Sequence, residues 1–281
     1  MIALLLLLQD HSFLATGGET HIVEKGQVTW TYPASTRDGW VVDGRILLAL
    51  SKSKAYPGGA AVEVDRSGKI LWEYKGTQAE VDTLQLLPNG NMLLTEAGPK
   101  PRLLEITREG KTAVEIALGS QTGNPHMQQR MSRKTDRGYL VPHLLDRVIR
   151  EYAPDGKTLW EVKTPDEPKE CWPFTAIRLP DGNTLASLTH GNRVAEFDKD
   201  GKIAWLLTNA DLPSPLLKDP CGVQRLPNGN TVICSYGAGG ADEVKLLEVT
   251  RDKKLVWTYK SGKAGGIHHA QILDVDGPPL R

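Results

Sequence analysis

A five-residue motif that recurs along the whole chain restricts the fold more than any other feature. It consists of a Gly-Lys turn and a short apolar run that ends in Trp. Four copies are clear: GQVTW at 26–30, GKILW at 68–72, GKTLW at 156–160 and GKIAW at 201–205. Two copies are degenerate: GKTAV at 110–114 has Val114 in the Trp position, and KKLVW at 253–257 has Lys253 in the Gly position. The final residues of consecutive copies lie 42 to 52 positions apart. A period of about this length is typical of propeller and solenoid repeats.

A second recurrent element is a tight turn that precedes most copies of the motif: LPNGN at 87–91, LPDGN at 179–183 and LPNGN at 226–230, with VDGR at 42–45 as a weaker relative. Asn-Gly and Asp-Gly between apolar runs predict two-residue hairpin turns, because these residues adopt positive φ at little cost. The stretches between the two elements, such as RLLEITREGK at 102–111, alternate apolar and polar residues as half-buried strands do. Each unit therefore predicts four antiparallel strands.

Six such units predict an all-β fold, a six-bladed β-propeller with four-stranded antiparallel blades. The chain begins with FLATGG, THIVEKG and QVTWTY, which match strands two to four of a blade, whereas GIHHAQILDVDG at 266–277 supplies only a first strand. We expect the C-terminal strand to pair with the N-terminal strands and close the ring, because each then satisfies the open edge of the other. Seven blades are the alternative if IALLLLL at 2–8 forms a further strand. The recurring Trp is interpreted as an apolar plate between neighbouring blades.

The N-terminal apolar run also bears on domain organisation and location. At 2–8 it is too short to span a bilayer but near the minimum length of the hydrophobic region of a signal peptide; no basic residue precedes it and no clear cleavage site follows. We assign residues 1–10 to an export-signal remnant or a first strand, and residues 11–281 to a single propeller domain. We expect no stable membrane span and a periplasmic or secreted location, with the cytoplasm as the alternative.

Charge and cysteine content exclude two classes of partner or scaffold. The 34 basic and 34 acidic side chains give no net charge, so no long-range field would attract nucleic acid or an anionic membrane. The three cysteines form no C-x-x-C pair, which argues against a disulfide framework or a zinc ribbon. We expect a monomer without a nucleic-acid partner, in which the three cysteines are small buried hydrophobic residues.

Propeller topology predicts the face on which a site would lie. The two kinds of tight turn join strands one to two and three to four, so both lie on one face of the ring. The longer, irregular loops all reach the opposite face, and such loops usually carry binding residues. The first strand of each blade is the innermost, so side chains near its beginning should surround the mouth of the central channel.

The candidate site residues are polar and aromatic side chains that this register places at the mouth. Alignment on the hairpin turns makes Asp82, Gln129 and His269 equivalent, and the adjacent His268 and His269 must point to opposite faces of their strand. We prefer His269 as the axial residue, with His268 as the alternative because the alignment is uncertain by one residue. Apolar walls with a few convergent polar groups are typical of small-molecule sites. The predicted catalytic residues are His126 and His269, and the predicted ligand-binding residues are Asp82, Gln129, Trp172, Asp219, Tyr236 and His268.

From about residue 20 to 277, the GK-x-x-W copies and the interleaved NGN turns resemble bacterial PQQ-like repeat, or quinoprotein-like, propellers. The resemblance implies the fold rather than the cofactor, since quinoprotein dehydrogenases are larger eight-bladed rings that hold the quinone beside adjacent cysteines and a calcium ion. This chain has no adjacent cysteine pair, so we expect no bound PQQ. A weaker likeness, carried by GIHHAQILD and NPHMQQRM, is to arylsulfotransferase-like propellers. It implies His269 or His126 as nucleophile or general base, and Arg130 or Arg225 as an anion clamp.

Three classes of function remain open at this point. The first, which we prefer, is the binding of a small molecule or glycan at the mouth of the channel. The second is an enzyme: a histidine-dependent transferase, or a hydrolase or lyase that holds a divalent metal ion through imidazoles from different blades, although no local metal-ligand spacing supports the metal. The third is a non-catalytic protein-interaction scaffold. In the simplest alternative, the polar groups at the mouth only solvate a water-filled channel.

Overall fold

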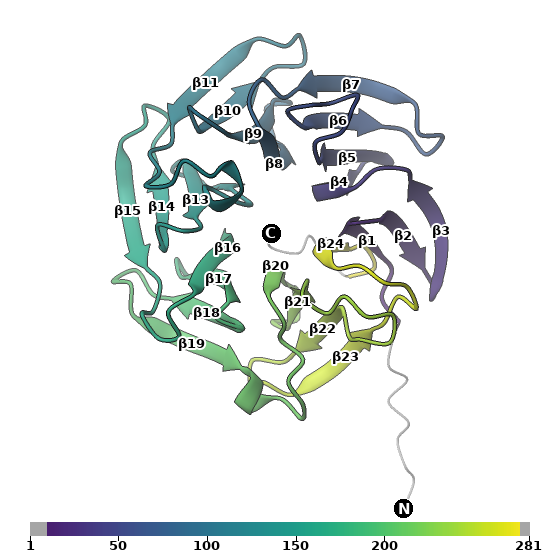
Figure 1. Ribbon diagram of the computed structural model, residues 1–281. Coiled ribbons are helices and arrows are strands. Elements are labelled where there is room, and N and C mark those ends of the chain that lie inside the picture. The colour runs from purple at the N-terminus through teal and green to yellow at the C-terminus, as the bar shows by residue number, and fades with distance from the viewer. Residues whose placement is uncertain (1–9, 276–281) are drawn as a thin grey trace, which may run out of the picture.

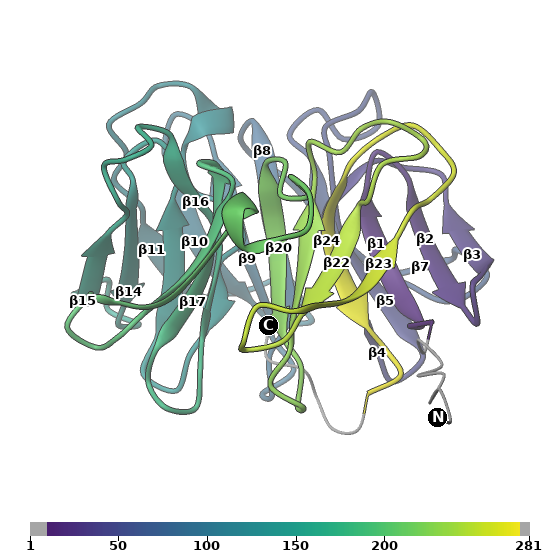
Figure 2. The ribbon, with the colours of Figure 1, turned by 90° about the horizontal axis from the view of Figure 1, so that it is seen from below.

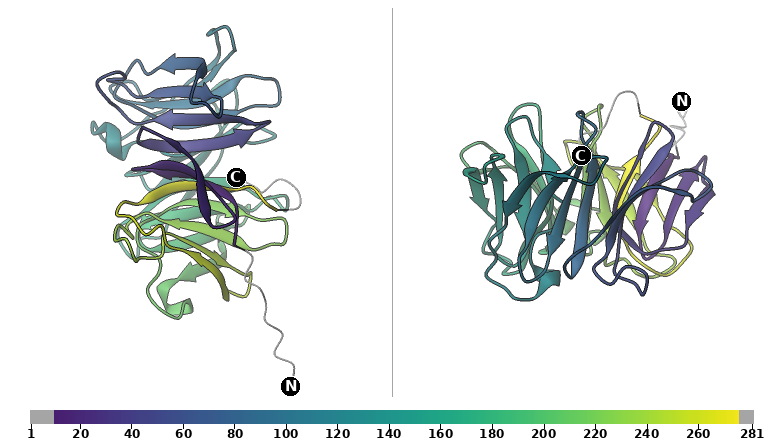
Figure 3. Two further views of the ribbon diagram at one scale, coloured as in Figure 1. Left: turned by 90° about the vertical axis from the view of Figure 1, so that its right-hand side faces the viewer. Right: turned by 90° about the horizontal axis from the view of Figure 1, so that it is seen from above.

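The computed structural model describes residues 10–275 and shows a ring of six four-stranded antiparallel sheets around a central axis (Figure 1). Each sheet is one blade, with its first strand nearest the axis and its last strand at the rim. In side view the blades stand next to one another around the ring (Figures 2 and 3). The predicted six-bladed propeller is confirmed. The run at 2–8, on which the seven-blade alternative and the export signal depended, lies outside the described residues.

The blades follow one another along the chain, and only blade 1 combines both ends of it. Blade 1 contains β24 (Ile267–Ile272), β1 (Phe13–Gly17), β2 (Thr20–Glu24) and β3 (Gln27–Tyr32), and blade 2 contains β4 (Thr36–Val42), β5 (Arg45–Leu50), β6 (Ala60–Val64) and β7 (Ile70–Lys75). Blade 3 contains β8 (Glu80–Leu86), β9 (Met92–Ala97), β10 (Arg102–Ile106) and β11 (Thr112–Ala117), and blade 4 contains β12 (Arg133–Lys134), β13 (Tyr139–His143), β14 (Val148–Tyr152) and β15 (Thr158–Lys163). Blade 5 contains β16 (Cys171–Arg178), β17 (Thr184–His190), β18 (Arg193–Phe197) and β19 (Ile203–Thr208), and blade 6 contains β20 (Pro220–Arg225), β21 (Thr231–Ser235), β22 (Leu246–Val249) and β23 (Leu255–Tyr259). Two short 3₁₀ helices, η1 (Pro125–Met127) and η2 (Asn209–Asp211), lie in the connections before blades 4 and 6.

Pairing between β24 and β1 closes the ring, as the unfinished repeat predicted. The ladder runs antiparallel from Phe13 opposite Ile272 to Thr16 opposite His269. In Figure 3 the yellow β24 lies directly beside the purple β1. Each of these strands would otherwise expose an unpaired backbone edge, which is why the two ends of the chain belong to one sheet.

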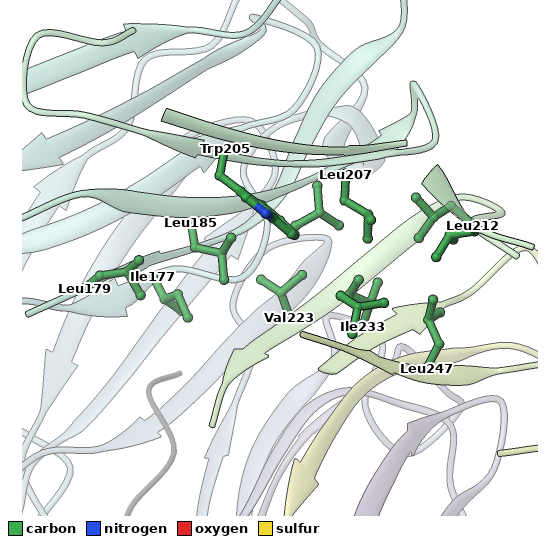
Figure 4. Packing of buried hydrophobic residues seen from close by; sticks show 12 residues of the cluster. Ile177, Leu179, Leu185, Trp205, Leu207, Leu212, Val223, Ile233 and Leu247 are labelled. Carbon is green, nitrogen blue, oxygen red and sulfur yellow. The ribbon is translucent and has the colours of Figure 1, made fainter. Parts of the chain in front are cut away.

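The recurring Trp packs between blades, as predicted, and also anchors a hydrogen bond. In four blades its indole N–H donates to a backbone carbonyl in the turn before the last strand of the next blade, over 2.9 to 3.2 Å: Trp30 to Arg66, Trp72 to Arg108, Trp160 to Lys199 and Trp205 to Arg251. Around Trp205, side chains such as Leu185 and Val223 from the facing blades form an apolar core (Figure 4). The recurring Trp side chain therefore contributes both buried apolar surface and a directional hydrogen bond between blades.

A buried glutamate on the third strand of five blades is a second regular feature, and the sequence analysis did not identify it. The repeat glutamates are Glu63, Glu105, Glu151, Glu196 and Glu248, each opposite the motif's Trp or Val position on the neighbouring strand. Glu196, for example, accepts from Asn183 of its own blade at 2.9 Å and from Arg225 of the next blade at 3.1 Å. Blade 1 has Ile22 in this position, opposite Trp30. Five blades thus carry a polar connection to the next blade at a site where blade 1 has an apolar side chain.

Two further expectations concern the cysteines and the membrane. All three cysteines are buried free thiols, in agreement with their interpretation as small hydrophobic residues. In the part of the chain that the structure describes, no helix has the length and apolar character needed to cross a bilayer.

Candidate functional site

The candidate site lies where the innermost strands begin, on the face that carries the longer loops, here called the upper face. The connections into β4, β8, β16, β20 and β24 reach this face, as do the loops after the second strands. Five charged side chains gather at its centre, and we call them the axial cluster: Arg37 on β4, Glu80 and Asp82 on β8, His126 on η1 and Arg130 just before β12. The sequence analysis placed the site on the same face.

A β-bulge near the start of the innermost strand positions these side chains. The register of β4 passes from Thr36 to Asp38 and omits Arg37, and the register of β8 omits Asp82 in the same way. In β16 the omitted residue is Phe174, and in β24 it is His268. Because a bulge leaves one residue unpaired and changes the direction of its side chain, the same irregularity brings residues from four blades to the axis.

The axial cluster is a compact set of ion pairs. Arg130 Nη1 lies 2.9 Å from Asp82 Oδ1 and 3.4 Å from Glu80 Oε2. Arg37 contributes Nη2 at 3.2 Å from Glu80 Oε1 and Nε at 3.4 Å from Asp82 Oδ1. The imidazole Nδ1 of His126 lies 3.4 Å from Glu80 Oε1. Two carboxyl groups therefore share two guanidinium groups, and His126, whose side chain is 60% exposed, covers the pair from the solvent side.

The surroundings shift the pKa values of the two carboxyl groups in opposite directions. Burial raises the pKa of Asp82, and the adjacent Glu80 adds to this against the attraction of Arg130 and Arg37. Burial also acts on Glu80, but the hydrogen bond from His126 and the two guanidinium groups outweigh it and lower its pKa to about 2. The Oδ2 atom of Asp82 is buried and has no hydrogen-bond partner among the described residues. Neighbouring carboxyl groups with divergent pKa values are typical of acid–base sites.

Three aromatic rings extend the site from the axial cluster, and we call them the aromatic row. Tyr236 and His268 are stacked, with ring centroids 4.1 Å apart and planes 16° apart. His268 is also parallel to Phe174, at 6.0 Å and 10°, and the Arg130 guanidinium lies 5.7 Å from the Phe174 centroid. Burial, with Arg37 and Arg130 nearby, lowers the pKa of His268 to about 3, so this imidazole is neutral near pH 7. Tyr236 is 39% exposed and is the open end of the row.

The two adjacent histidines of β24 have different surroundings, and their roles differ from the preferred assignment. His269 is completely buried and makes an edge contact with Trp40 at 4.5 Å, with its Nδ1 3.5 Å from Asp38 Oδ1. His268 is the bulge residue and therefore corresponds to Asp82, whereas the turn-based alignment made His269 equivalent to Asp82. The bulge accounts for the difference of one residue.

The other predicted residues are distributed around the site. Gln129 is buried below the axial cluster, and its side-chain amide has no hydrogen-bond partner among the described residues. The Trp172 ring lies 4.3 Å from the His190 ring and is tilted 37° to it, beside the aromatic row rather than in it. Asp219 connects blades 5 and 6, because its carboxylate accepts from the backbone N–H of His190 and its own N–H donates to Asn192.

The sequence-based prediction missed three members of the site: the bulge residues Arg37 and Phe174, and Glu80, which is regularly paired with Ala97 at the start of β8. Of the two suggested anion clamps, Arg130 belongs to the axial cluster, whereas Arg225 lies at the other end of its strand and pairs with Glu196. Within residues 10–275, no three His, Cys, Asp or Glu side chains are grouped so that they could hold a metal ion.

Comparisons with known proteins agree on the repeat and on the fold. Residues 145–273 match the PQQ-like repeat family model described as outer membrane protein assembly factor BamB. No curated protein sequence matches the chain significantly. A solved protein of unknown function from Bacteroides caccae is 24% identical, with a TM-score of 0.79 over 97% of this chain and 100% of that chain.

Two solved lyases share the architecture at lower identity. A streptogramin B lyase is 16% identical with a TM-score of 0.63, covering 90% of this chain and 80% of that chain. A catalytically inactive His-to-Ala variant of virginiamycin B lyase from Staphylococcus aureus, solved with quinupristin, is 15% identical with a TM-score of 0.62, covering 92% and 86%. At this level of identity the similarity is one of fold.

Proposed function

We propose that this six-bladed β-propeller, whose residues 145–273 match the PQQ-like repeat family model, binds a small molecule or glycan at the upper end of its axis. The proposal rests on the fact that every blade contributes a polar or aromatic side chain to this end of the axis. In order from blade 1 to blade 6, these residues are His268, Arg37, Asp82, Arg130, Phe174 and Tyr236. A ring that needed only to close could have placed aliphatic side chains at these six positions.

The two halves of the site indicate the chemistry of the ligand. The aromatic row offers ring faces, and Tyr236 at its open end can stack on an aromatic ring or on the apolar face of a sugar. The axial cluster holds two carboxyl and two guanidinium groups, so it presents both donors and acceptors without a large net charge. We therefore expect a neutral or zwitterionic ligand that carries a flat ring and a hydrogen-bonding group.

The cluster is packed, and this defines where contact would occur. Asp82 and Arg130 are almost completely buried, whereas His126 and Tyr236 are exposed. A ligand would therefore rest on His126 and Tyr236 and reach the buried groups only through polar atoms at its tip.

Fragment screening by saturation-transfer NMR, with small aromatic compounds and monosaccharides as probes, tests this proposal. Replacing Tyr236 by Ala should raise the Kd of a bound fragment about 2- to 13-fold, because one ring stacking contact contributes on the order of 0.5–1.5 kcal/mol. Leu159→Ala, at an equally exposed residue on the outer strand β15, is the matched control and should leave the Kd unchanged. A library without binders, or binders that tolerate Tyr236→Ala, would refute the proposal.

A second candidate is an acid–base enzyme that uses the axial cluster, favoured by the divergent pKa values of Glu80 and Asp82 and by the exposed His126 beside them. Glu80 can hold the proton on His126 Nδ1 and so orient the ring, which leaves Nε2 for a reacting group. The loss of activity in the His-to-Ala variant of the similarly folded lyase makes its ligand the first probe. Incubation with quinupristin, followed by mass spectrometry, should give a product that His126→Ala and Glu80→Gln both abolish. Unchanged quinupristin would exclude this substrate.

Location and oligomeric state remain predictions. The family description as an outer membrane assembly factor favours a periplasmic or secreted location over the cytoplasm. Cell fractionation with an antibody against the chain tests the location, and light scattering after gel filtration tests the expected monomer.

A further inference from the structure

A cavity of about 1000 Å³ lies on the outer side of blades 1 and 2, away from the axial cluster. We call it the outer groove. Its walls are β3 with the residues that follow it, 28–35, the loop 50–56 before β6, and the turn 66–68 before β7. We propose that the outer groove is a second binding site and that its ligand is an acidic oligosaccharide.

The outer groove lies at the interface where the repeat is irregular. At the next interface, Arg108 in the turn of blade 3 reaches the repeat glutamate Glu63 at 2.6 Å. The equivalent turn residue of blade 2 is Arg66, but blade 1 has Ile22 in place of the glutamate. Arg66 instead lies 3.4 Å from Glu24, and both side chains are more than 40% exposed. Because an exposed pair at this distance is weak, the Arg66 guanidinium is available to an anion from solution.

Aromatic rings provide the apolar part of the groove. Trp30 and Tyr32 lie two positions apart on β3, hence on one side of it, with ring centroids 5.9 Å apart and planes 24° apart. Tyr56 is a third ring in the lining. The Trp30 indole N–H donates to the Arg66 carbonyl, and the Tyr56 hydroxyl donates to Glu73 at 2.5 Å. These two rings are therefore held by hydrogen bonds, and Tyr32 is stacked on Trp30. Fixed rings suit a sugar, whose apolar face stacks while its hydroxyl groups bind elsewhere.

The Trp of other interfaces is covered differently. The Arg178 guanidinium lies 4.7 Å from the Trp160 ring, and Arg251 lies 5.6 Å from the Trp205 ring. Trp30 instead stacks on Tyr32 and borders the cavity. Trp257 stacks on Tyr259 in blade 6 in the same way, but that pair does not line the outer groove.

The remaining lining residues determine the charge of the ligand. Hydroxyl side chains also line the outer groove: Ser35, Ser51, Ser53 and Ser67, with Thr29 and Thr31 alternating with the aromatic rings along β3. Lys52 and Arg66 are the charged members, and no lining residue is acidic. Hydroxyl groups match the hydroxyl groups of a sugar, and the two cations match a carboxylate on it. An extended peptide paired with the free edge of β3 is the competing occupant. The hydroxyl groups and the fixed rings favour the sugar.

Isothermal titration with an oligogalacturonate of six residues, compared with a cello-oligosaccharide of equal length, tests the proposal. Arg66→Ala removes the guanidinium but keeps the backbone carbonyl that accepts from Trp30, so the interface contact is preserved. Lys199→Ala is the matched control, because Lys199 occupies the same turn position at Trp160. We expect the oligogalacturonate to bind at least tenfold more tightly than the neutral sugar. Arg66→Ala and Lys52→Ala should each weaken it at least threefold, whereas Lys199→Ala should have no effect.

The outcomes separate this site from the axial one. Tyr32→Ala should abolish binding of the oligogalacturonate, whereas Tyr236→Ala on the upper face should leave it unchanged. The exposed Lys52 keeps the test valid if Tyr32→Ala does not fold, because Tyr32 also contacts the core. Absence of binding, equal binding of both sugars, or full binding by Arg66→Ala would overturn the proposal. Binding of an extended peptide that Tyr32→Ala abolishes, with no sugar binding, would overturn the proposal and assign the groove to a peptide.

Discussion

At the scale of single residues, the repeat glutamates are the least expected feature of this propeller. A buried carboxylate is costly unless several donors satisfy it, and each of these glutamates receives donors from two blades. Glu105, for example, accepts from Asn91 of its own blade at 2.8 Å and from the Tyr139 hydroxyl of the next blade at 2.6 Å. These directional hydrogen bonds fix the position of one blade relative to the next. Apolar packing alone is less directional.

Replacing Glu196 by Ala should lower the free energy of unfolding by about 3–5 kcal/mol, because it leaves Arg225 and Arg251 close together without their anion. Urea denaturation followed by tryptophan fluorescence measures the loss. Glu24→Ala, which breaks only the exposed pair with Arg66, is the control and should change stability by less than about 1 kcal/mol. Equal effects of the two substitutions would show that the repeat glutamates do not connect the blades energetically.

At the scale of strands, the bulges explain what sequence reasoning about the site achieved. Turn spacing predicted a site on the upper face and included His126, Asp82, His268 and Tyr236, because loops and strand starts follow from the register of the hairpins. Strand alternation then fails at the bulge, where one residue is left without a partner. The omission of Arg37 and Phe174 and the choice of His269 follow from that irregularity. The bulge cannot be predicted from the local sequence, because the unpaired residue is Arg in one blade and Phe in another.

On the opposite face, His11, just before β1, contacts two acidic residues from other parts of the ring. Its Nε2 lies 2.7 Å from Oε2 of Glu248 on β22 of blade 6, and its Nδ1 lies 3.2 Å from Asp274 Oδ1, just after β24. Burial tends to lower the pKa of His11, but the hydrogen bonds and charges of these two carboxylates outweigh it and raise the pKa above 6.5. Protonated His11 therefore holds both ends of the chain against blade 6.

The raised pKa predicts how stability depends on pH. The contribution of His11 is fully present below about pH 6.5 and is lost as the pH rises through the raised value in the folded state. His11→Gln should lower the free energy of unfolding by about 1–3 kcal/mol at pH 5.5, since it removes hydrogen bonds to charged groups, and by less at pH 8.5. Denaturation at both pH values measures the difference, and His190→Gln at an exposed histidine is the control. An equal loss at both pH values would contradict the protonated bridge.

At the scale of the whole molecule, the repeat period and the turns were enough to predict six blades, four strands in each and the closure of the ring. These features depend on spacing along the chain, which the sequence states directly. The repeat glutamates are also present in the sequence, for example in VEVD at 62–65 and LEVT at 247–250. However, a polar residue on a half-buried strand is normally predicted to face the solvent. Only the structure shows that these side chains point into an interface. The difference between blade 1 and the other blades follows from the same residue position and was missed with it.

Closure of the ring gives the last prediction. A chain that ends at residue 265 lacks β24, which buries Ile267 and Ile272 and whose Gln271 side chain accepts from the backbone of Val41 at 2.6 Å and donates to it at 3.2 Å. Burial of the two isoleucines alone contributes about 3–6 kcal/mol, a large part of the 5–15 kcal/mol typical of folded domains.

We therefore expect the shortened chain to lose its near-ultraviolet circular dichroism and to aggregate through the exposed edge of β1. A chain that ends at residue 275 keeps β24 and is the control. A synthetic peptide of residues 266–275 should restore the spectrum of the shortened chain. Cooperative unfolding of the shortened chain at the temperature of the control would mean that the blades hold together without the closing strand.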